Sequence, residues 1–228
     1  MLAFNKKEIT LMQKLNTPAK IQDFLNTLKF NFEEPARNAS SIASAGGKGV
    51  TLKSPIMTLR EGNAHCMEGA ILGAYILSNH GHKPLILHLK TTKGDFDHVV
   101  ALFKQDSFWG ALSKTNHAVL RYREPVYRNV RELVMSYFHE YFLDTGAKTL
   151  REFSRPLNLN VFESGWERME GDLWGIDQEL DKIKHYKIVP NKIIKKLRKA
   201  DKIEIEAGKI AEYPSSRAKL TTGQVKRK

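Results

Sequence analysis

The feature that most constrains the fold is a block between residues 63 and 113, which places one apolar helix directly before three strands. Residues 63–78 carry apolar side chains at helical spacing, mixed with small residues that let a helix approach its neighbour closely. These small residues are Ala64, Gly69, Ala70, Gly73 and Ala74. Three segments typical of strands follow, separated by turns at 93–95 and 105–106: 84–89, 98–103 and 107–113. Because connections this short join antiparallel neighbours, the block predicts a helix packed on a small antiparallel sheet.

Helical periodicity predicts further helices on both sides of this block. They are expected at 18–29, in a short segment after Ser54 and Pro55, at 126–143, at 173–185 and in a basic amphipathic segment after Pro190. Residues 38–48 are rich in Ser, Ala and Gly and predict a loop. Helices, then a small antiparallel sheet, then more helices are typical of the α+β class. A chain of 228 residues can bury the core of such a domain without disulfides.

The net positive charge is concentrated in the C-terminal fifth of the chain. The formal charge is +12, and residues 182–228 supply most of it, since they hold 15 Lys and Arg against 4 Asp and Glu. We therefore expect a nearly neutral domain over 1–185 and a basic extension over 186–228, partly helical and then disordered from about Tyr213. Such an extension suits an acidic partner. Nucleic acid is not favoured, because no known DNA- or RNA-binding motif accompanies the charge.

The chain has a single cysteine, Cys66, which excludes an intrachain disulfide and a multi-cysteine zinc site. An unpaired thiol is typical of a reducing compartment, and the first seven residues lack the apolar stretch of a signal peptide, so we expect a cytoplasmic protein. The longest nearly uncharged apolar stretch, 69–77, is far shorter than the ~20 residues of a membrane helix, which argues against membrane insertion. His80 and His82 are closely spaced, but no carboxylate lies nearby at ligand spacing, so neither a metal nor a cofactor is expected.

Cys66 and His98 are the residues with the clearest chemical meaning. Cys66 falls in the first turn of its helix, for which Asn63 is the predicted cap. The N–H groups and the dipole at a helix N-terminus stabilise a thiolate against a thiol, whose ordinary pKa is about 8.5. His98 begins a strand of the sheet on which this helix would pack. A hairpin that turns at 105–106 pairs His98 with Ser113, so a hydroxyl would lie beside the imidazole where an orienting group belongs.

Several stretches of the sequence resemble the transglutaminase-like superfamily, which shares the papain-type arrangement of a helix-borne Cys with a His and an Asp on a sheet. They are Gly62–Ala70 around the cysteine, Ile76–Pro84 at the helix end, Asp97–Phe103 around the histidine, and Phe108–Ser113. The resemblance covers roughly residues 18–125 of the chain. It implies Cys66 as the nucleophile and His98 as the general base.

The third member of the implied triad stays open between two residues. The family usually has Asp four residues after the tryptophan that corresponds to Trp109, and this chain has Ser113 there. A hydroxyl can accept a hydrogen bond from the imidazole, but it supplies no negative charge to stabilise an imidazolium. Asn116, three residues further on, is the alternative of the papain type. With either residue we expect weaker activation of the base than Asp would give, or loss of activity.

The resemblance implies a cysteine-dependent acyl-transfer enzyme that acts on a carboxamide or peptide bond of a peptide or protein substrate. Hydrolysis is favoured over cross-linking, because nothing in the sequence indicates an acceptor amine. The expected oxyanion donors are the Cys66 backbone N–H and the Asn63 side chain. The alternative is a catalytically silent module of the same fold whose basic extension contacts an acidic partner or nucleic acid. The serine at position 113 favours this alternative.

Overall fold

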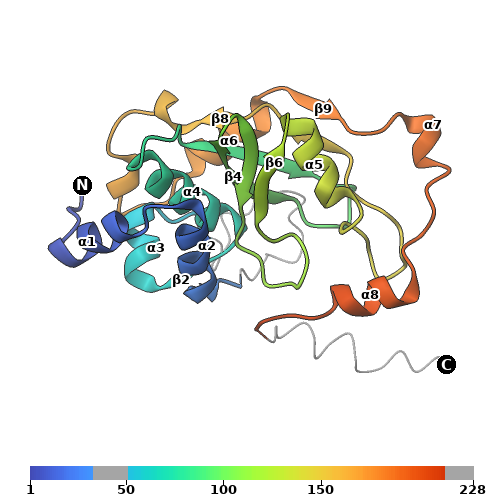
Figure 1. The fold of residues 1–228 in the computed structure, drawn as a ribbon, viewed down its shortest axis with the longest axis horizontal. Coiled ribbons are helices and arrows are strands. Elements are labelled where there is room, and N and C mark those ends of the chain that lie inside the picture. Colours follow the sequence, from blue (N-terminus) through green and yellow to red (C-terminus); the bar gives the residue numbers. More distant parts are fainter. Residues whose placement is uncertain (33–50, 214–228) are drawn as a thin grey trace.

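The computed structural model describes residues 1–32 and 51–213, in which helices surround one central sheet (Figure 1). In this part of the chain the sheet has seven strands in the order β6-β5-β4-β3-β7-β9, and β8 also pairs with β3. Neighbouring strands run antiparallel throughout. The strands are β3 (Leu85–Lys90), β4 (His98–Gln105), β5 (Phe108–Leu112), β6 (Arg123–Tyr127), β7 (Glu152–Ser154), β8 (Leu157–Asn158) and β9 (His185–Lys187).

Helix α4 (Cys66–Ser78) packs against β4, as its small residues predict. A Cβ atom on Gly69 would lie 2.4 Å from the Cβ of Lys114, and one on Gly73 would lie 3.1 Å from Leu112. Protein interiors are close-packed, so larger residues at these positions would push the helix off the sheet. The predicted α+β class, with a cysteine-bearing helix packed on an antiparallel sheet, is confirmed.

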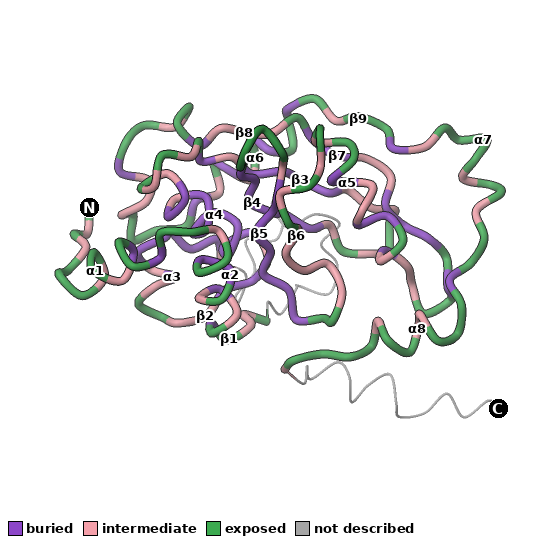
Figure 2. The backbone as a smooth tube through the Cα atoms, in the orientation of Figure 1, coloured by how far each residue is buried: buried purple, intermediate pink, exposed green. Residues whose placement is uncertain are grey.

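Side chains of the central strands alternate between two apolar cores, one on each face of the sheet. The first core joins α4 to Val99, Ala101, Phe103 and Leu112. Helices α2 (Pro18–Thr27) and α3 (Pro55–Glu61) pack on α4. The second core joins α5 (Val130–Phe138) to Leu87, Leu89, Val100 and Leu102. Figure 2 shows the buried backbone of α4, β4 and β5 at the centre of the molecule.

The predicted helices appear with shifted ends. The helix expected at 18–29 is α2, which is capped by the Thr17 hydroxyl. The helix expected at 173–185 is α6 (Trp174–Lys182). The helix expected at 126–143 is shorter at both ends: residues 123–127 form an edge strand with β5, and the helix ends at Phe138. Pro125 is compatible with that edge, where a missing N–H removes no ladder hydrogen bond.

The hairpin between β4 and β5 turns one residue later than predicted. Asp106 and Ser107 both have positive φ, 48° and 72°, as the two-residue turn that matches strand twist requires. Residue 105 therefore pairs with residue 108, and the predicted pairing of His98 with Ser113 is wrong, because this register aligns residue 98 with residue 115. A shift of two positions leaves every side chain on its predicted face, since strand side chains alternate with a period of two.

Some elements have no counterpart in the sequence predictions. They are α1 (Lys6–Lys14), the short parallel pair β1 (Lys29–Phe30) and β2 (Asn63–Ala64), the strands β6 to β9, and the 3-10 turns η2 (Leu159–Val161) and η3 (Trp166–Arg168). Apart from α1, these elements are five residues long or shorter. Periodicity over so few residues gives little signal.

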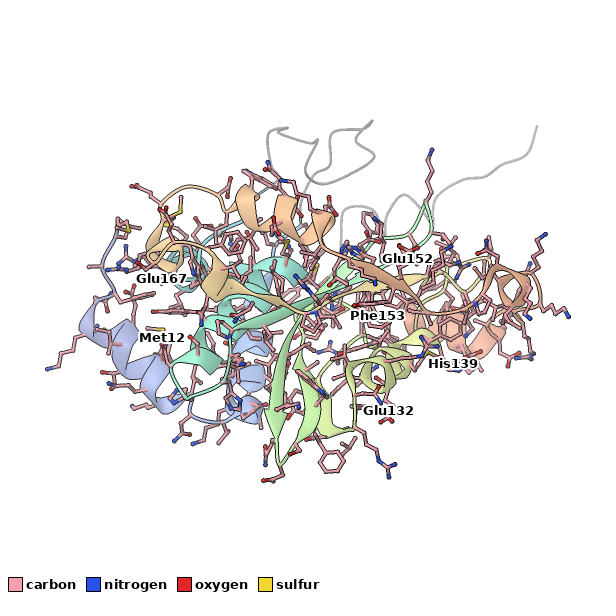
Figure 3. All side chains as sticks on the ribbon, turned by 90° about the horizontal axis from the view of Figure 1, so that it is seen from above. Met12, Glu132, His139, Glu152, Phe153 and Glu167 are labelled. Atoms are coloured by element: carbon pink, nitrogen blue, oxygen red, sulfur yellow. The ribbon has the colours of Figure 1, made fainter. Side chains whose placement is uncertain are left out.

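The predicted C-terminal extension begins inside the sheet. Strand β9 crosses the predicted boundary after residue 185 and pairs with β7 alongside Glu152 and Phe153 (Figure 3). Two short helices follow, α7 (Asn191–Ile194) and α8 (Lys202–Gly208). The loop predicted over 38–48 and the chain from residue 214 lie outside the described residues. Among the residues described, no helix is long and apolar enough to cross a membrane.

Candidate active site

Cys66 is the first residue of α4, so its side chain lies at the helix N-terminus. The cap is His65, not the predicted Asn63, which belongs to β2. The Nδ1 atom of His65 accepts from the Met67 N–H at 3.2 Å, and the Glu68 carboxylate accepts from the His65 N–H at 3.0 Å. An imidazole nitrogen replaces the usual capping oxygen because it accepts the same backbone bond. These bonds fix where the helix begins, and hence where the thiol lies.

The imidazoles of His65 and His98 both interact with the Cys66 thiol. Burial raises the pKa of this half-buried thiol, but hydrogen bonds and charge from the two rings outweigh burial and hold its pKa well below the ordinary value. Both ring nitrogens of His65 have other partners, because Nδ1 accepts from Met67 and Nε2 bonds to the Thr51 carbonyl at 2.9 Å. These two bonds hold the His65 ring in place at the start of α4.

Ser113 lies on the other side of the His98 ring. Its Oγ is 2.8 Å from Nε2 of His98, and the two residues are 1% and 5% exposed. The Ser113 hydroxyl donates its proton to the Leu120 carbonyl, which leaves its oxygen to accept from His98. His98 thus carries a proton on Nε2, and Nδ1 is the nitrogen that remains for Cys66. His98 and Ser113 are thus in contact, as the sequence suggested. They are not directly opposite each other, and the contact runs diagonally across the hairpin.

A glutamine of α2 fixes the backbone of Ser113. Gln22 donates from Nε2 to the Ser113 carbonyl at 2.9 Å, and its Oε1 accepts from the Ser113 N–H at 2.9 Å. Gln22 is not among the residues predicted from the sequence. The available signal was the position of Gln22 next to Ile21, on a helix that buries Ile21 and Leu25. A buried amide needs hydrogen-bond partners, so a polar residue at this position indicates a specific contact.

Asn116 does not contact His98 in this way. Its Nδ2 donates to the Tyr213 carbonyl at 2.9 Å, and its Oδ1 accepts from the Tyr213 N–H at 2.8 Å. The amide therefore faces the C-terminal segment. Of the two orienting residues that the sequence left open, the structure brings Ser113 to the imidazole.

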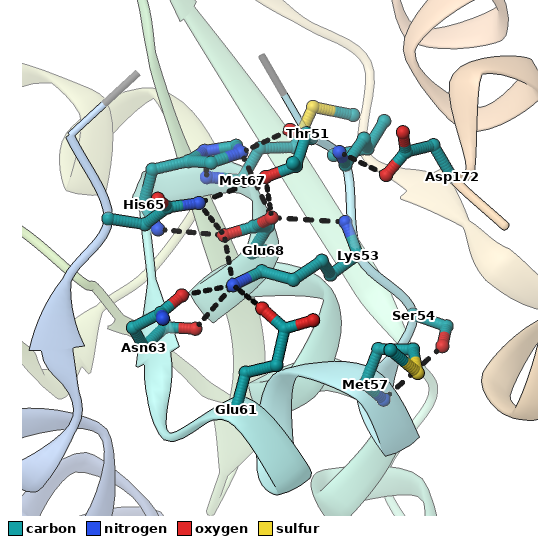
Figure 4. Close-up of polar contacts among 12 residues, drawn as sticks. Thr51, Lys53, Ser54, Met57, Glu61, Asn63, His65, Met67, Glu68 and Asp172 are labelled. Atoms are coloured by element: carbon teal, nitrogen blue, oxygen red, sulfur yellow. Dashed lines mark hydrogen bonds and ion pairs between the residues drawn. The ribbon is translucent and has the colours of Figure 1, made fainter. Parts of the chain in front are cut away.

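Asn63 bonds to the buried ammonium of Lys53 through both its side-chain and its backbone oxygen (Figure 4). The same ammonium lies 3.1 Å from Glu61 and 3.8 Å from Glu68. The fully buried Glu68 also accepts from the Thr51 hydroxyl at 2.8 Å and from the Lys53 N–H at 3.1 Å. This network ties the start of α4 to the preceding chain. The bond to Lys53 uses the amide oxygen of Asn63, whereas an oxyanion donor would use the amide N–H. The oxyanion role of Asn63 therefore stays a prediction.

A second imidazole pair lies beside the start of β4. His88 bonds from Nε2 to the Asp97 carboxylate at 3.1 Å and from Nδ1 to Nε2 of His185 at 3.1 Å, and His185 bonds from Nδ1 to the Ile183 carbonyl at 2.9 Å. A carboxylate and a carbonyl only accept, so both outer nitrogens carry protons. Burial raises the pKa of Asp97, but the hydrogen bonds from His88 and Thr91 together with the charge of His88 outweigh burial, and the pKa lies below its ordinary value.

Tyr141 has a buried hydroxyl with no hydrogen-bond partner among the described residues. The residue is 3% exposed. Burial raises the pKa of its phenol well above the ordinary value, and the charges of Cys66, Asp95 and Asp97 raise it further. A neutral phenol therefore lies within electrostatic range of the thiol.

Comparison with known proteins does not assign a family. No protein-family model matches the chain, and no curated protein matches it. Among solved structures, the chain is similar to LapG of Legionella pneumophila, with 20% identity, a TM-score of 0.35, and coverage of 46% of this chain and 59% of that chain. A second structure, of EGTA-treated LapG, has 14% identity, a TM-score of 0.41, and coverage of 77% of this chain and 85% of that chain. Likeness this low carries no argument about activity.

Proposed function

We propose that this protein is a cysteine-dependent acyl-transfer enzyme of the transglutaminase-like kind, which hydrolyses a carboxamide or peptide bond in a peptide or protein substrate. The observation that carries the proposal is that the His98 imidazole, which lies 2.8 Å from the Ser113 hydroxyl, also helps to lower the pKa of the Cys66 thiol. Acyl transfer by a thiol needs a nucleophile beside a base that a third group orients. The lowered pKa of Cys66 supports the same chemistry, because the thiolate is the nucleophile.

In the proposed reaction the Cys66 thiolate attacks the carbonyl carbon, while His98 holds the proton that the thiol has given up. The charge that develops on the carbonyl oxygen is stabilised by the Cys66 N–H at the N-terminus of α4. His98 then gives its proton to the departing amine as the C–N bond breaks, and a thioester remains. Water attacks the thioester and loses a proton to His98, and release of the carboxylic acid restores the thiol.

Ser113 makes the orienting group of this site weaker than a carboxylate would be. Its oxygen accepts from Nε2–H of His98 and so keeps Nδ1 toward the sulfur, but it brings no negative charge to the imidazolium. We therefore expect the correct tautomer with slower turnover than an aspartate at this position would support.

The single cysteine allows a direct test, because any iodoacetamide adduct reports Cys66. We expect half-maximal labelling well below a pH of about 8.5, the midpoint of an ordinary thiol, and a higher midpoint in His98→Ala than in the wild type. The matched control is His80→Ala, which removes an imidazole that bonds to the Met12 carbonyl beyond the far end of α4. A wild-type midpoint at or above about 8.5 would contradict the proposal.

Turnover can be followed with a p-nitrophenyl ester, which releases its chromophore when the thiol is acylated. We expect a stoichiometric burst followed by slower hydrolysis in the wild type, and no burst in Cys66→Ala. Adding a primary amine then measures how the acyl group partitions between water and amine. If the product is mainly the amide, the proposed reaction is cross-linking and not hydrolysis.

A second candidate function, a catalytically silent binding module, is favoured by the exposed basic residues after β9. These residues are Lys192, Lys195, Lys196, Arg198 and Lys199. Clustered positive charge suits an acidic partner. This candidate predicts an ordinary labelling midpoint for Cys66 together with salt-sensitive retention on immobilised polyglutamate.

A further inference from the structure

Residues 209–213, which follow α8, lie against the loop after Ser113 (Figure 1). We call residues 209–213 the strap and residues 114–121 the Ser113 loop. The two segments pair in antiparallel fashion through a bridge between His117 and Ala211. Two backbone bonds flank the bridge, from Ala118 N–H to the Ile210 carbonyl at 3.0 Å and from Glu212 N–H to the Asn116 carbonyl at 2.8 Å. Part of the predicted extension is thus bound to the domain by main-chain hydrogen bonds.

Asn116 is the loop residue with the most bonds to the strap. It is 4% exposed, and its side-chain amide bonds to both the N–H and the carbonyl of Tyr213. An amide side chain reproduces the donor and acceptor of a peptide group, so Asn116 extends the antiparallel pairing by one step. Arg121 and Glu212 add an ion pair of 3.5 Å.

The Ser113 loop needs this support because Leu120 has a φ of 61°. The left-handed region is unfavourable for a bulky residue and persists where surrounding contacts impose it. At this end of the loop the Leu120 N–H donates to Glu140 at 2.7 Å, and Glu140 in turn pairs with Arg123 at 2.6 Å. The strap therefore holds one end of the loop while Glu140 holds the other.

The position of Leu120 decides how the Ser113 hydroxyl is used. Its carbonyl accepts the hydroxyl proton, and this leaves the Ser113 oxygen as an acceptor for Nε2–H of His98. If the carbonyl moved away, the hydroxyl could rotate and donate to Nε2 instead. His98 would then carry its proton on Nδ1, toward Cys66, and could not act as a base for the thiol.

We propose that Asn116 and the strap are positioning elements of the candidate active site, which hold the Ser113 loop so that the Leu120 carbonyl keeps the Ser113 hydroxyl an acceptor for His98. The inference rests on the proposed function, since its effect is measured at Cys66. Asn116 acts through the loop and is not a catalytic residue. The strap can be loosened without opening either core, because Ile210, Ala211 and Glu212 are exposed.

The test uses the full chain with two substitutions that weaken the pairing at different points. Asn116→Ala removes the side-chain bonds, and Glu212→Pro removes the N–H that donates to the Asn116 carbonyl. Glu212→Ala is the matched control, because it keeps that N–H and loses only the ion pair to Arg121. We expect both weakening variants to raise the iodoacetamide midpoint of Cys66 by about half to one pH unit, a roughly three- to tenfold loss of thiolate at fixed pH below the midpoint. The control should label like the wild type.

The double variant should shift the midpoint no further than the larger single change, because both act on one pairing. Asn116→Asp, which keeps an oxygen for the Tyr213 N–H, is the milder variant if Asn116→Ala fails to fold, and it should give a smaller shift of the same sign. Wild-type midpoints in folded Asn116 and Glu212→Pro variants, alongside a shifted midpoint in His98→Ala, overturn this inference alone. No shift in His98→Ala overturns the proposed function and this inference with it.

Discussion

Replacing Ser113 with alanine isolates what one hydroxyl contributes to the reactivity of Cys66. The change removes the acceptor 2.8 Å from Nε2 of His98 and the donor to the Leu120 carbonyl. It leaves the two backbone bonds to Gln22 intact, so the strand keeps its position. Because Ser113 is 1% exposed, water has little access to replace the lost hydroxyl. Nε2–H of His98 then becomes a buried donor without its partner.

The expected effect follows from how much more strongly the hydroxyl binds a charged ring than a neutral one. A hydrogen bond to a charged group contributes about 1.5–3 kcal/mol, and one between neutral groups about 0.5–1.5 kcal/mol. Ser113 therefore favours the imidazolium form of His98, and with it the Cys66 thiolate, by about 1–1.5 kcal/mol. Since about 1.4 kcal/mol corresponds to a tenfold change, the labelling midpoint should rise by about one pH unit. Leaving the donor unsatisfied should also lower the free energy of unfolding by about 1–3 kcal/mol.

The assay is iodoacetamide labelling across pH, read by intact-protein mass, with thermal unfolding on the same samples. Ser78→Ala is the control, because it removes a hydroxyl that bonds to the Tyr75 carbonyl at the other end of α4. A folded Ser113→Ala protein with the wild-type midpoint would refute the reasoning, since it would mean that the hydroxyl does not stabilise the imidazolium.

Three further predictions concern the surroundings of the site. Gly69→Ala should lower the free energy of unfolding in denaturant titration by about 1–3 kcal/mol through overpacking against Lys114, whereas Gly175→Ala in α6, which has open space, should not destabilise the fold. Tyr141→Phe should leave the unfolding temperature unchanged or raise it, because the lost hydroxyl has no partner among the described residues, and a clear decrease would contradict the contacts. Asp97→Asn should destabilise the protein near neutral pH. Because the folded pKa of Asp97 lies below its ordinary value, the difference from wild type in unfolding temperature should shrink as pH falls below about 3.9 and vanish once the carboxyl is protonated; a constant difference would exclude the linkage.

The helix and the strands of residues 63–113 could be predicted because their signals are local. Small residues in an apolar helix require close packing, and alternating strands with short turns pair in antiparallel order. The turn of the β4–β5 hairpin lies one residue later than the sequence predicts. This difference shifts the pairing of the two strands by two positions, so His98 and Ser113 stay on the predicted face of the sheet.

The cap of α4 shows where local reasoning failed. Asn63 is a favourable capping residue by type, but it pairs in β2 and bonds to Lys53, and the imidazole of His65 caps the helix instead. The sequence could not indicate this, because Lys53 and Thr51 reach the site from an earlier segment of the chain.

By itself, the sequence determined that a thiol would lie at the tip of a helix packed on an antiparallel sheet with His98 at the start of a strand. Those features depend on residues close to one another in the chain. Only the tertiary structure decided that Ser113, and not Asn116, contacts His98. The Leu120 carbonyl orients the Ser113 hydroxyl, whereas the side chain of Asn116 bonds to the distant Tyr213. Hydrogen bonds between groups far apart in sequence leave no periodic pattern, and they exist only once the chain has folded.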